Sequence, residues 1–196
     1  MAMIRETIVT TVNADGCIHV APIGIIADGE GWIIAPFRPS TTLDNLRAVP
    51  FAVANHTDDV RIFAGCLTGR RDWAAVAASE VPVPRLAVAL SHAELAVARV
   101  VEDAERPRFH CRVVSAAAHA PFAGFNRAQA AVVEAAILAS RLQFLPREKV
   151  EREIAYLEIA VAKTGGPVER EAWAWLMDKI RTHYGKIELG DAIKFK

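Results

Sequence analysis

One short stretch of the chain concentrates side chains that can bind an anion. An arginine and a proline are followed by three consecutive hydroxyl residues, in the order Arg38-Pro39-Ser40-Thr41-Thr42, and a short helix is expected from there to about Ala48. A serine or threonine at a helix start caps free backbone N–H groups, and a cap needs only one hydroxyl. A phosphate monoester would use the whole group, because hydroxyl and N–H groups donate to it, the helix dipole attracts it and arginine offers a planar fork. The pattern favours a phosphate site over a simple cap.

Other reactive residues are weaker candidates. Cys17 and His19 have the spacing of metal ligands on one strand, but no second pair completes a site, so no metal is expected. His110 and Cys111 are adjacent on an expected strand and must point to opposite faces, which argues against a catalytic pair. All the lysines lie at position 149 or beyond, which excludes a Schiff-base lysine in the first half. No residue stands out as a catalytic acid, base or nucleophile.

Composition limits the class of protein. The chain has 196 residues, with 23 Lys+Arg against 23 Asp+Glu, and therefore no formal net charge. Proteins that bind nucleic acid or an anionic membrane usually carry a basic surplus, so neither partner is expected. Hydrophobic residues make up 53% of the chain, which is enough to bury a large core. Because an uncharged protein with so much apolar surface tends to self-associate, we expect a homo-oligomer.

The sequence also indicates a compartment. Its three cysteines are odd in number and far apart, which fits a reducing cytosol better than a disulfide framework. The N-terminus turns polar at once and does not read as a signal peptide. The longest apolar run, 128–139, contains Glu134 and is shorter than the roughly 20 residues of a membrane span. We therefore expect a cytoplasmic protein.

The elements that must position residues 38–42, here called the phosphate motif, are β-strands. Two runs rich in β-branched residues, 4–13 and 17–26, flank Asp15-Gly16, a strong hairpin signal because glycine readily takes the positive φ of a tight turn. Further strands are expected over 32–37, 50–56, 85–103 and 107–119. Together they predict a small β-barrel over residues 1–120.

After Pro121 the pattern becomes helical. Helices are expected over 125–145, 146–166 and 167–185, with the last one ending at Gly185. We expect residues 121–196 to form a three-helix cap packed on the barrel. The predicted fold class is α+β, a β-barrel followed by a three-helix C-terminal part.

The order of these segments resembles a known group of proteins. The Asp-Gly hairpin, the strand HVAPIGI (19–25) and the segment PFRPSTTLDNL (36–46) look like the FMN-binding split-barrel flavoproteins, which include flavin reductases and pyridoxamine-phosphate oxidases. With NHTDD (55–59) and FNRAQAAVVEAAILASRL (125–142) added, the chain is similar to the DUF447 family over nearly its whole length.

This resemblance implies an FMN held in a split barrel at a homodimer interface. The phosphate would bind Arg38, Ser40, Thr41 and Thr42, with Asn45 in reach one turn along the helix. The ring would lie along the second strand, against Ala21, Pro22, Ile23 and Gly24. Two further candidates for the cofactor site are Asn55 and Arg127.

The resemblance further implies an oxidoreductase of flavin-reductase type that acts on a small-molecule substrate or electron donor, with the flavin carrying the chemistry. Whether the chain is an enzyme stays open. One alternative is a non-enzymatic flavin carrier or sensor, which would bind FMN without turnover. Another is a split barrel that binds a deazaflavin or haem, of which haem would need an axial histidine.

Overall fold

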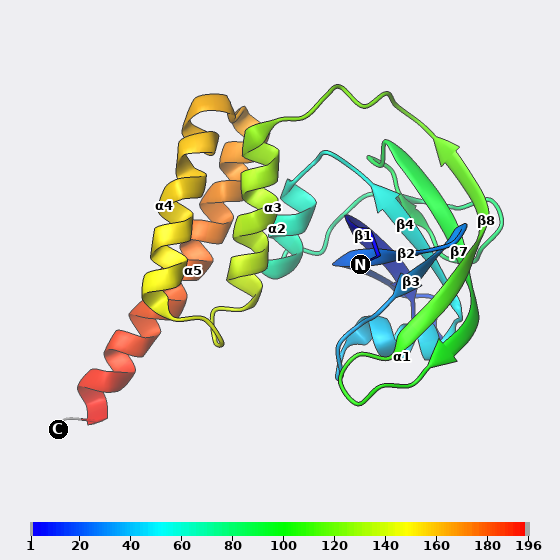
Figure 1. Cartoon of the computed structure of the whole chain (residues 1–196), viewed down its shortest axis with the longest axis horizontal. Coiled ribbons are helices and arrows are strands. Elements are labelled where there is room, and N and C mark those ends of the chain that lie inside the picture. Colours follow the sequence, from blue (N-terminus) through cyan, green and yellow to red (C-terminus); the bar gives the residue numbers. More distant parts are fainter. Residues whose placement is uncertain (1, 195–196) are drawn as a thin grey trace. The chain divides into compact units, whose positions relative to one another are not determined.

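The computed structural model describes residues 2–194, which divide into two compact units. Among these residues, the first unit contains 2–58 and 72–122, and the second contains 59–71 and 123–194. Figure 1 shows that the first unit holds the strands and the second holds most of the helices. A helical segment from the first half of the sequence thus belongs to the helical unit. The expected packing of a C-terminal cap on the barrel stays a prediction.

The first unit is a closed barrel of antiparallel strands. Its strand order is β1-β2-β3-β8-β7-β4 (Figure 1). The strands are β1 (Ile4–Val12), β2 (Ile18–Asp28), β3 (Gly31–Ile34), β4 (Phe51–His56), β7 (Ser91–Val101) and β8 (Arg108–Ala118). A separate two-stranded sheet pairs β5 (Ala75–Val76) with β6 (Arg85–Leu86). The predicted hairpin joins β1 to β2, and Gly16 in its turn has the expected positive φ of 81°.

One edge of β2 is paired along only part of its length because β3 is short. β2 pairs with β1 along its length, but on its other edge it pairs with β3 only over Ile26–Asp28. Among the residues that the structure describes, no strand pairs with this second edge between Ala21 and Ile25. At Gly31 the β3 backbone approaches β8 so closely that a Cβ atom would lie 2.3 Å from the Cys111 carbonyl oxygen, so only glycine fits. The prediction of a split barrel is confirmed.

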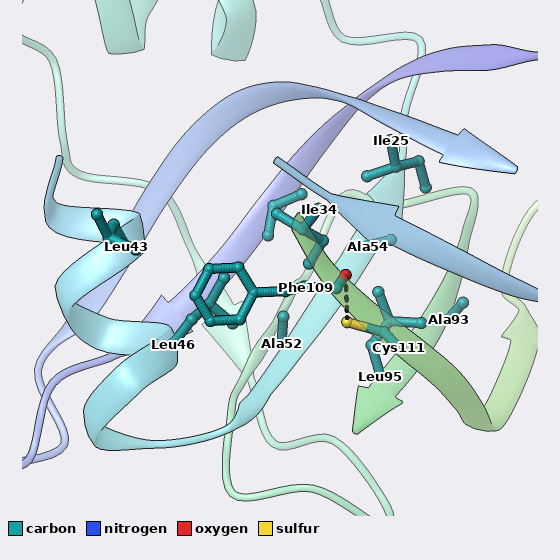
Figure 2. Close-up of a cluster of buried hydrophobic side chains, with 11 residues drawn as sticks. Ile25, Ile34, Leu43, Leu46, Ala52, Ala54, Ala93, Leu95, Phe109 and Cys111 are labelled. Carbon is teal, nitrogen blue, oxygen red and sulfur yellow. Dashed lines mark hydrogen bonds between the residues drawn. The ribbon is translucent and has the colours of Figure 1, made fainter. Parts of the chain in front are cut away.

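One cluster of buried side chains fills the barrel and attaches helix α1 (Thr41–Ala48) to it. Figure 2 shows the ring of Phe109, from β8, beside Leu46 of α1, and Leu43 of the same helix belongs to the cluster. The other members are Val9, Ile25, Ile34, Ala52, Ala54, Ala93, Leu95 and Cys111. Phe109 is 1% exposed and is among the largest fully buried side chains of the chain. The position of α1 therefore depends on the barrel core.

The second unit is a helical bundle. Its helices are α2 (Arg61–Leu67), α3 (Arg127–Ser140), α4 (Arg147–Thr164) and α5 (Pro167–Lys194), and α2, α3 and α5 all contact one another. Most buried residues of α3 are alanines, which let neighbouring helices approach closely. The predicted three-helix C-terminal part is confirmed. The predicted end at Gly185 is wrong: α5 continues to Lys194, because one glycine costs a helix only about 1 kcal/mol and no proline follows it.

Candidate functional site

The phosphate motif lies in the segment that connects β3 to α1, and a loop of the same unit fixes this segment. The backbone N–H of Arg38 donates to the Glu105 carbonyl oxygen at 2.8 Å. The guanidinium of Arg106 donates to the Ala35 carbonyl oxygen through Nε at 3.1 Å and Nη2 at 2.8 Å. The Cζ atom of Arg106 lies 4.3 Å from the centre of the Phe37 ring. The loop between β7 and β8 therefore holds the backbone on the approach to the motif.

The N-terminus of α1 has the geometry of an anion site. Ser40 is the N-cap residue, with extended backbone, and its Oγ accepts a hydrogen bond from the Leu43 N–H at 3.3 Å. The N–H groups of Thr41 and Thr42 belong to the first turn of the helix, where no helical carbonyl oxygen lies four residues earlier. They therefore have no intrahelical hydrogen-bond partner. Thr41 is exposed, whereas Thr42 is only 3% exposed. The predicted cap is present, and it leaves a hydroxyl and backbone donors for a ligand.

Arg38 stands beside this helix end in a network of charged groups. Its Nη2 is paired with the Glu102 carboxylate, and its Nε donates to the Asp103 carbonyl oxygen at 3.0 Å. The same Glu102 carboxylate accepts two hydrogen bonds from Arg47 Nη2, at 2.9 and 3.0 Å. Two guanidinium groups thus share one carboxylate. An anion bound at the turn would meet Arg38 in a fixed position and would compete with Glu102 for it.

The two asparagines of the predicted site have structural roles. Asn45 is 3% exposed, and its Nδ2 donates to Thr11 Oγ1 at 3.0 Å, which ties α1 to β1. Asn55 is 0% exposed; its Nδ2 donates to the Ile8 carbonyl oxygen at 3.0 Å and its Oδ1 accepts from the Leu86 N–H at 2.7 Å. Asn55 therefore joins β1, β4 and β6, and it offers no surface to a ligand.

The β2 residues expected near the ring lie at the same end of the barrel as the turn. Ile26 of β2 is paired with Ile33 of β3, which places Ile34, the last residue of β3, opposite Ile25. Beyond Ile34 the chain continues into the phosphate motif. The half-buried residues Ala21–Gly24 follow along the open edge of β2 at that end. α1 also contacts β1 and β2. The turn and this edge thus lie at the same end of the barrel, and their joint contact with a cofactor stays a prediction, as does that of Arg127, which belongs to the helical unit.

A buried carboxylate that sequence reasoning missed holds another part of the barrel unit. Glu94, on β7, is 0% exposed. Its Oε1 accepts from the Ser79 N–H at 2.8 Å and Oγ at 2.7 Å, and its Oε2 accepts from the N–H groups of Glu80 at 2.7 Å and Val81 at 3.0 Å. Burial alone would raise the pKa of Glu94, but these hydrogen bonds, with one from His92, lower it to about 2. Glu94 therefore anchors the loop 79–81 as a carboxylate.

Two histidines extend this network. His92 Nε2 lies 3.2 Å from Glu94 Oε1, and His92 Nδ1 lies 2.8 Å from His119 Nε2. The two imidazole rings are stacked with their centres 5.0 Å apart. Burial, Arg85 and His92 lower the pKa of His119. The network lies where β7 begins and β8 ends, which is the end of the barrel opposite the phosphate motif.

The barrel core also contains a cysteine thiol. Cys111 is buried, and burial raises the pKa of its thiol to about 12, so it is not a thiolate nucleophile near neutral pH. Among the side chains that the structure describes, no group of three His, Cys, Asp or Glu is placed to hold a metal ion. No helix among the described residues is long and apolar enough to span a membrane.

An antiparallel barrel in which a short β3 pairs with only part of β2, followed by helix α1, has the fold of the split-barrel flavin reductases. The chain can be superimposed on the styrene monooxygenase flavin reductase SMOB from Pseudomonas putida S12 with a TM-score of 0.52 at 11% identity, covering 61% of this chain and 84% of that one. Nitrilotriacetate monooxygenase component B from Mycobacterium thermoresistibile gives a TM-score of 0.51 at 16% identity, covering 60% and 71%.

More specifically, the chain belongs to the DUF447 family. The model described as "Protein of unknown function (DUF447) N-terminal domain" matches residues 5–120, and the model "Protein of unknown function (DUF447)" matches residues 126–178. The FMN-bound DUF447 protein MM1853 from Methanosarcina mazei has a similar structure, with a TM-score of 0.78 at 22% identity over 91% of this chain and 96% of that one. No curated protein matches the chain.

Proposed function

We propose that this chain binds FMN in its barrel unit and acts as a flavin-dependent oxidoreductase. The observation that carries the proposal is the turn 38–42, where free hydroxyl and N–H donors at the start of α1 stand beside a positioned arginine. The FMN-bound relative from Methanosarcina mazei, which shares the fold over nearly the whole chain, supports the same ligand. A homodimer, expected from the family resemblance, belongs to this proposal.

The residues divide into phosphate and ring contacts. Ser40, Thr41 and the first N–H groups of α1 would bind the phosphate, Arg38 would add a charge-assisted hydrogen bond, and Thr42 would contribute mainly its backbone. The open edge of β2 at Ala21–Gly24 would offer backbone groups to the polar rim of the ring. Bound FMN supplies hydride or electron transfer, whereas the chain binds and orients it. Asn45 would act indirectly by holding α1 against β1.

A visible spectrum tests the cofactor. The purified protein is expected to carry yellow flavin or, after the flavin is removed, to bind FMN in a fluorescence titration. Riboflavin, which lacks the phosphate, is expected to bind at least about tenfold more weakly, because it forms no charge-assisted contact at the turn. Absence of FMN binding, or equal affinities for FMN and riboflavin, would contradict the proposal. Anaerobic reduction of the bound flavin by NADH or NADPH then distinguishes an oxidoreductase from a flavin carrier.

Replacing Arg38 by alanine is expected to weaken FMN binding by roughly 1.5–3 kcal/mol, which is about a 10- to 150-fold increase in Kd. The loss comes from the contact with the phosphate, so the affinity for riboflavin should not change. Titration of both flavins against wild type and variant measures this difference. Equal weakening of both flavins would mean that Arg38 acts on the fold of the turn and not on the phosphate.

Replacing Glu102 by glutamine is expected to tighten FMN binding several-fold. The carboxylate is shared between Arg38 and Arg47 and would repel a phosphate at the turn, so its neutralisation frees Arg38 and removes a like charge. The effect should shrink as salt is raised, because the Glu102 carboxylate is largely exposed to solvent. Weaker binding in this variant would show that Glu102 positions Arg38 for the ligand.

A further inference from the structure

The helical unit contains an open cleft that the flavin site does not use. Its volume is about 870 Å³, within the range of pockets that bind small molecules. The walls come from the loop after α2, the end of α3 and one face of α5, which are all parts of the helical unit. Apolar side chains, among them Leu67, Leu142 and Ala174, line it together with the indole of Trp175.

The cleft also presents cations that are not neutralised. Arg70 is held in place, because its guanidinium lies 3.9 Å from the centre of the Trp175 ring and its Nη1 donates to Thr68 Oγ1 at 2.8 Å. Lys179 is half-buried in the same wall. Within the part of the chain that the structure describes, neither cation has a carboxylate within ion-pair distance. The one acidic residue of the lining, Asp178, is largely exposed and lies 3.9 Å from Arg181.

We propose that this cleft binds a small molecule that combines an anionic group with a flat apolar part. A carboxylate or a phosphate would accept hydrogen bonds from the planar fork of Arg70 and from Lys179. The flat part would lie against the apolar wall beside Trp175. The charges support this class of ligand, since Arg70 and Lys179 line the same cleft and neither has a carboxylate within ion-pair distance among the described residues. The proposal does not depend on FMN binding.

The test follows the indole N–H signal of Trp175 by NMR. This signal is assigned as the one that is missing from the spectrum of the Trp175→Phe variant. Four probes are titrated: AMP and 2-naphthoate, which are flat anions, and adenosine and 2-naphthamide, which are their uncharged counterparts. The anions are expected to shift the Trp175 signal with Kd values at least about tenfold lower than those of the neutral probes. A preference for AMP or for 2-naphthoate then separates a phosphate ligand from a carboxylate ligand.

Two variants make the test specific. Arg70→Met keeps the apolar stem over Trp175 but removes the charge, and it is expected to weaken binding of the anionic probes at least about tenfold. The matched control is Lys149→Met, on α4, where the lysine already faces Glu153 at 3.7 Å; this variant should bind as the wild type does. The titration is repeated in Arg38→Ala, so that binding at the barrel turn cannot contribute to the signal.

Three results would overturn the proposal. The first is no shift of the Trp175 signal by either anion up to about 10 mM. The second is equal binding of charged and neutral probes, which would make the cleft merely apolar. The third is unchanged affinity in Arg70→Met, in which case Arg70 and Lys179 only complement the negative C-terminal end of α3.

Discussion

Replacing Glu94 by glutamine is expected to lower the free energy of unfolding of the barrel unit by about 3 kcal/mol at pH 7. A glutamine side chain has the same shape but turns an NH₂ group towards backbone N–H groups that now donate to a carboxylate oxygen, such as those of Glu80 and Val81. Because the site is fully buried, water cannot replace the lost acceptor. The lowering of the Glu94 pKa from 4.5 to about 2 corresponds to about the same free energy.

The same residue sets an acid limit for the fold. The pKa of Glu94 is lower in the folded chain than in the unfolded one. Its contribution to the free energy of unfolding is therefore complete above about pH 4.5 and is lost as the pH falls towards 2. Urea unfolding at pH 7 and at a pH between these two values should show the variant less sensitive to acid than the wild type. Glu80→Gln, at an exposed neighbouring side chain, is the matched control. Its free energy of unfolding should stay within about 0.5 kcal/mol of the wild-type value at both pH values. Equal acid sensitivity of Glu94→Gln and wild type would contradict this role.

The parts of the fold that local chemistry determines could be predicted from the sequence. The β1–β2 turn follows from Asp15-Gly16, and the start of α1 follows from a hydroxyl residue in the N-cap position. The sequence therefore places residues 38–42 correctly between a strand and a helix, and phosphate binding there stays a prediction. The three C-terminal helices follow from long runs without breakers between prolines.

What could not be predicted depends on contacts between distant parts of the chain. Asn55 is a polar residue at the end of a strand, and only the position of Leu86 shows that its amide is used within the fold. Glu94 sits between apolar residues in a strand and reads as a solvent-facing position, until the loop 79–81 is seen to cover it. Helix α2 is too short to show a helical period of apolar residues in the sequence. Its residues belong to the helical unit, whose other helices lie more than 50 residues later in the chain.

Replacing Phe109 by alanine is expected to have the largest effect on stability, a loss of about 3–5 kcal/mol. The ring is 1% exposed, belongs to the same core cluster as Leu43 and Leu46, and lies beside Leu46 of α1 (Figure 2), so its removal leaves a cavity where the helix meets the strands. Phe122→Ala makes the same chemical change at a side chain that is 56% exposed, and it is expected to cost less than about 1 kcal/mol. Urea unfolding of the three proteins measures both values.

This core variant also tests how the fold supports the proposed flavin site. Ser40, Thr41 and the free N–H groups can converge on a phosphate only while α1 keeps its place against the barrel, and Phe109 belongs to the buried cluster that contains Leu43 and Leu46 of that helix. Under conditions where Phe109→Ala is still folded, its Kd for FMN should therefore rise, whereas that of Phe122→Ala should not. Because the phosphate contacts would be the ones disturbed, riboflavin binding should change less than FMN binding. An unchanged affinity for FMN would show that the phosphate is held by groups other than the N-terminus of α1.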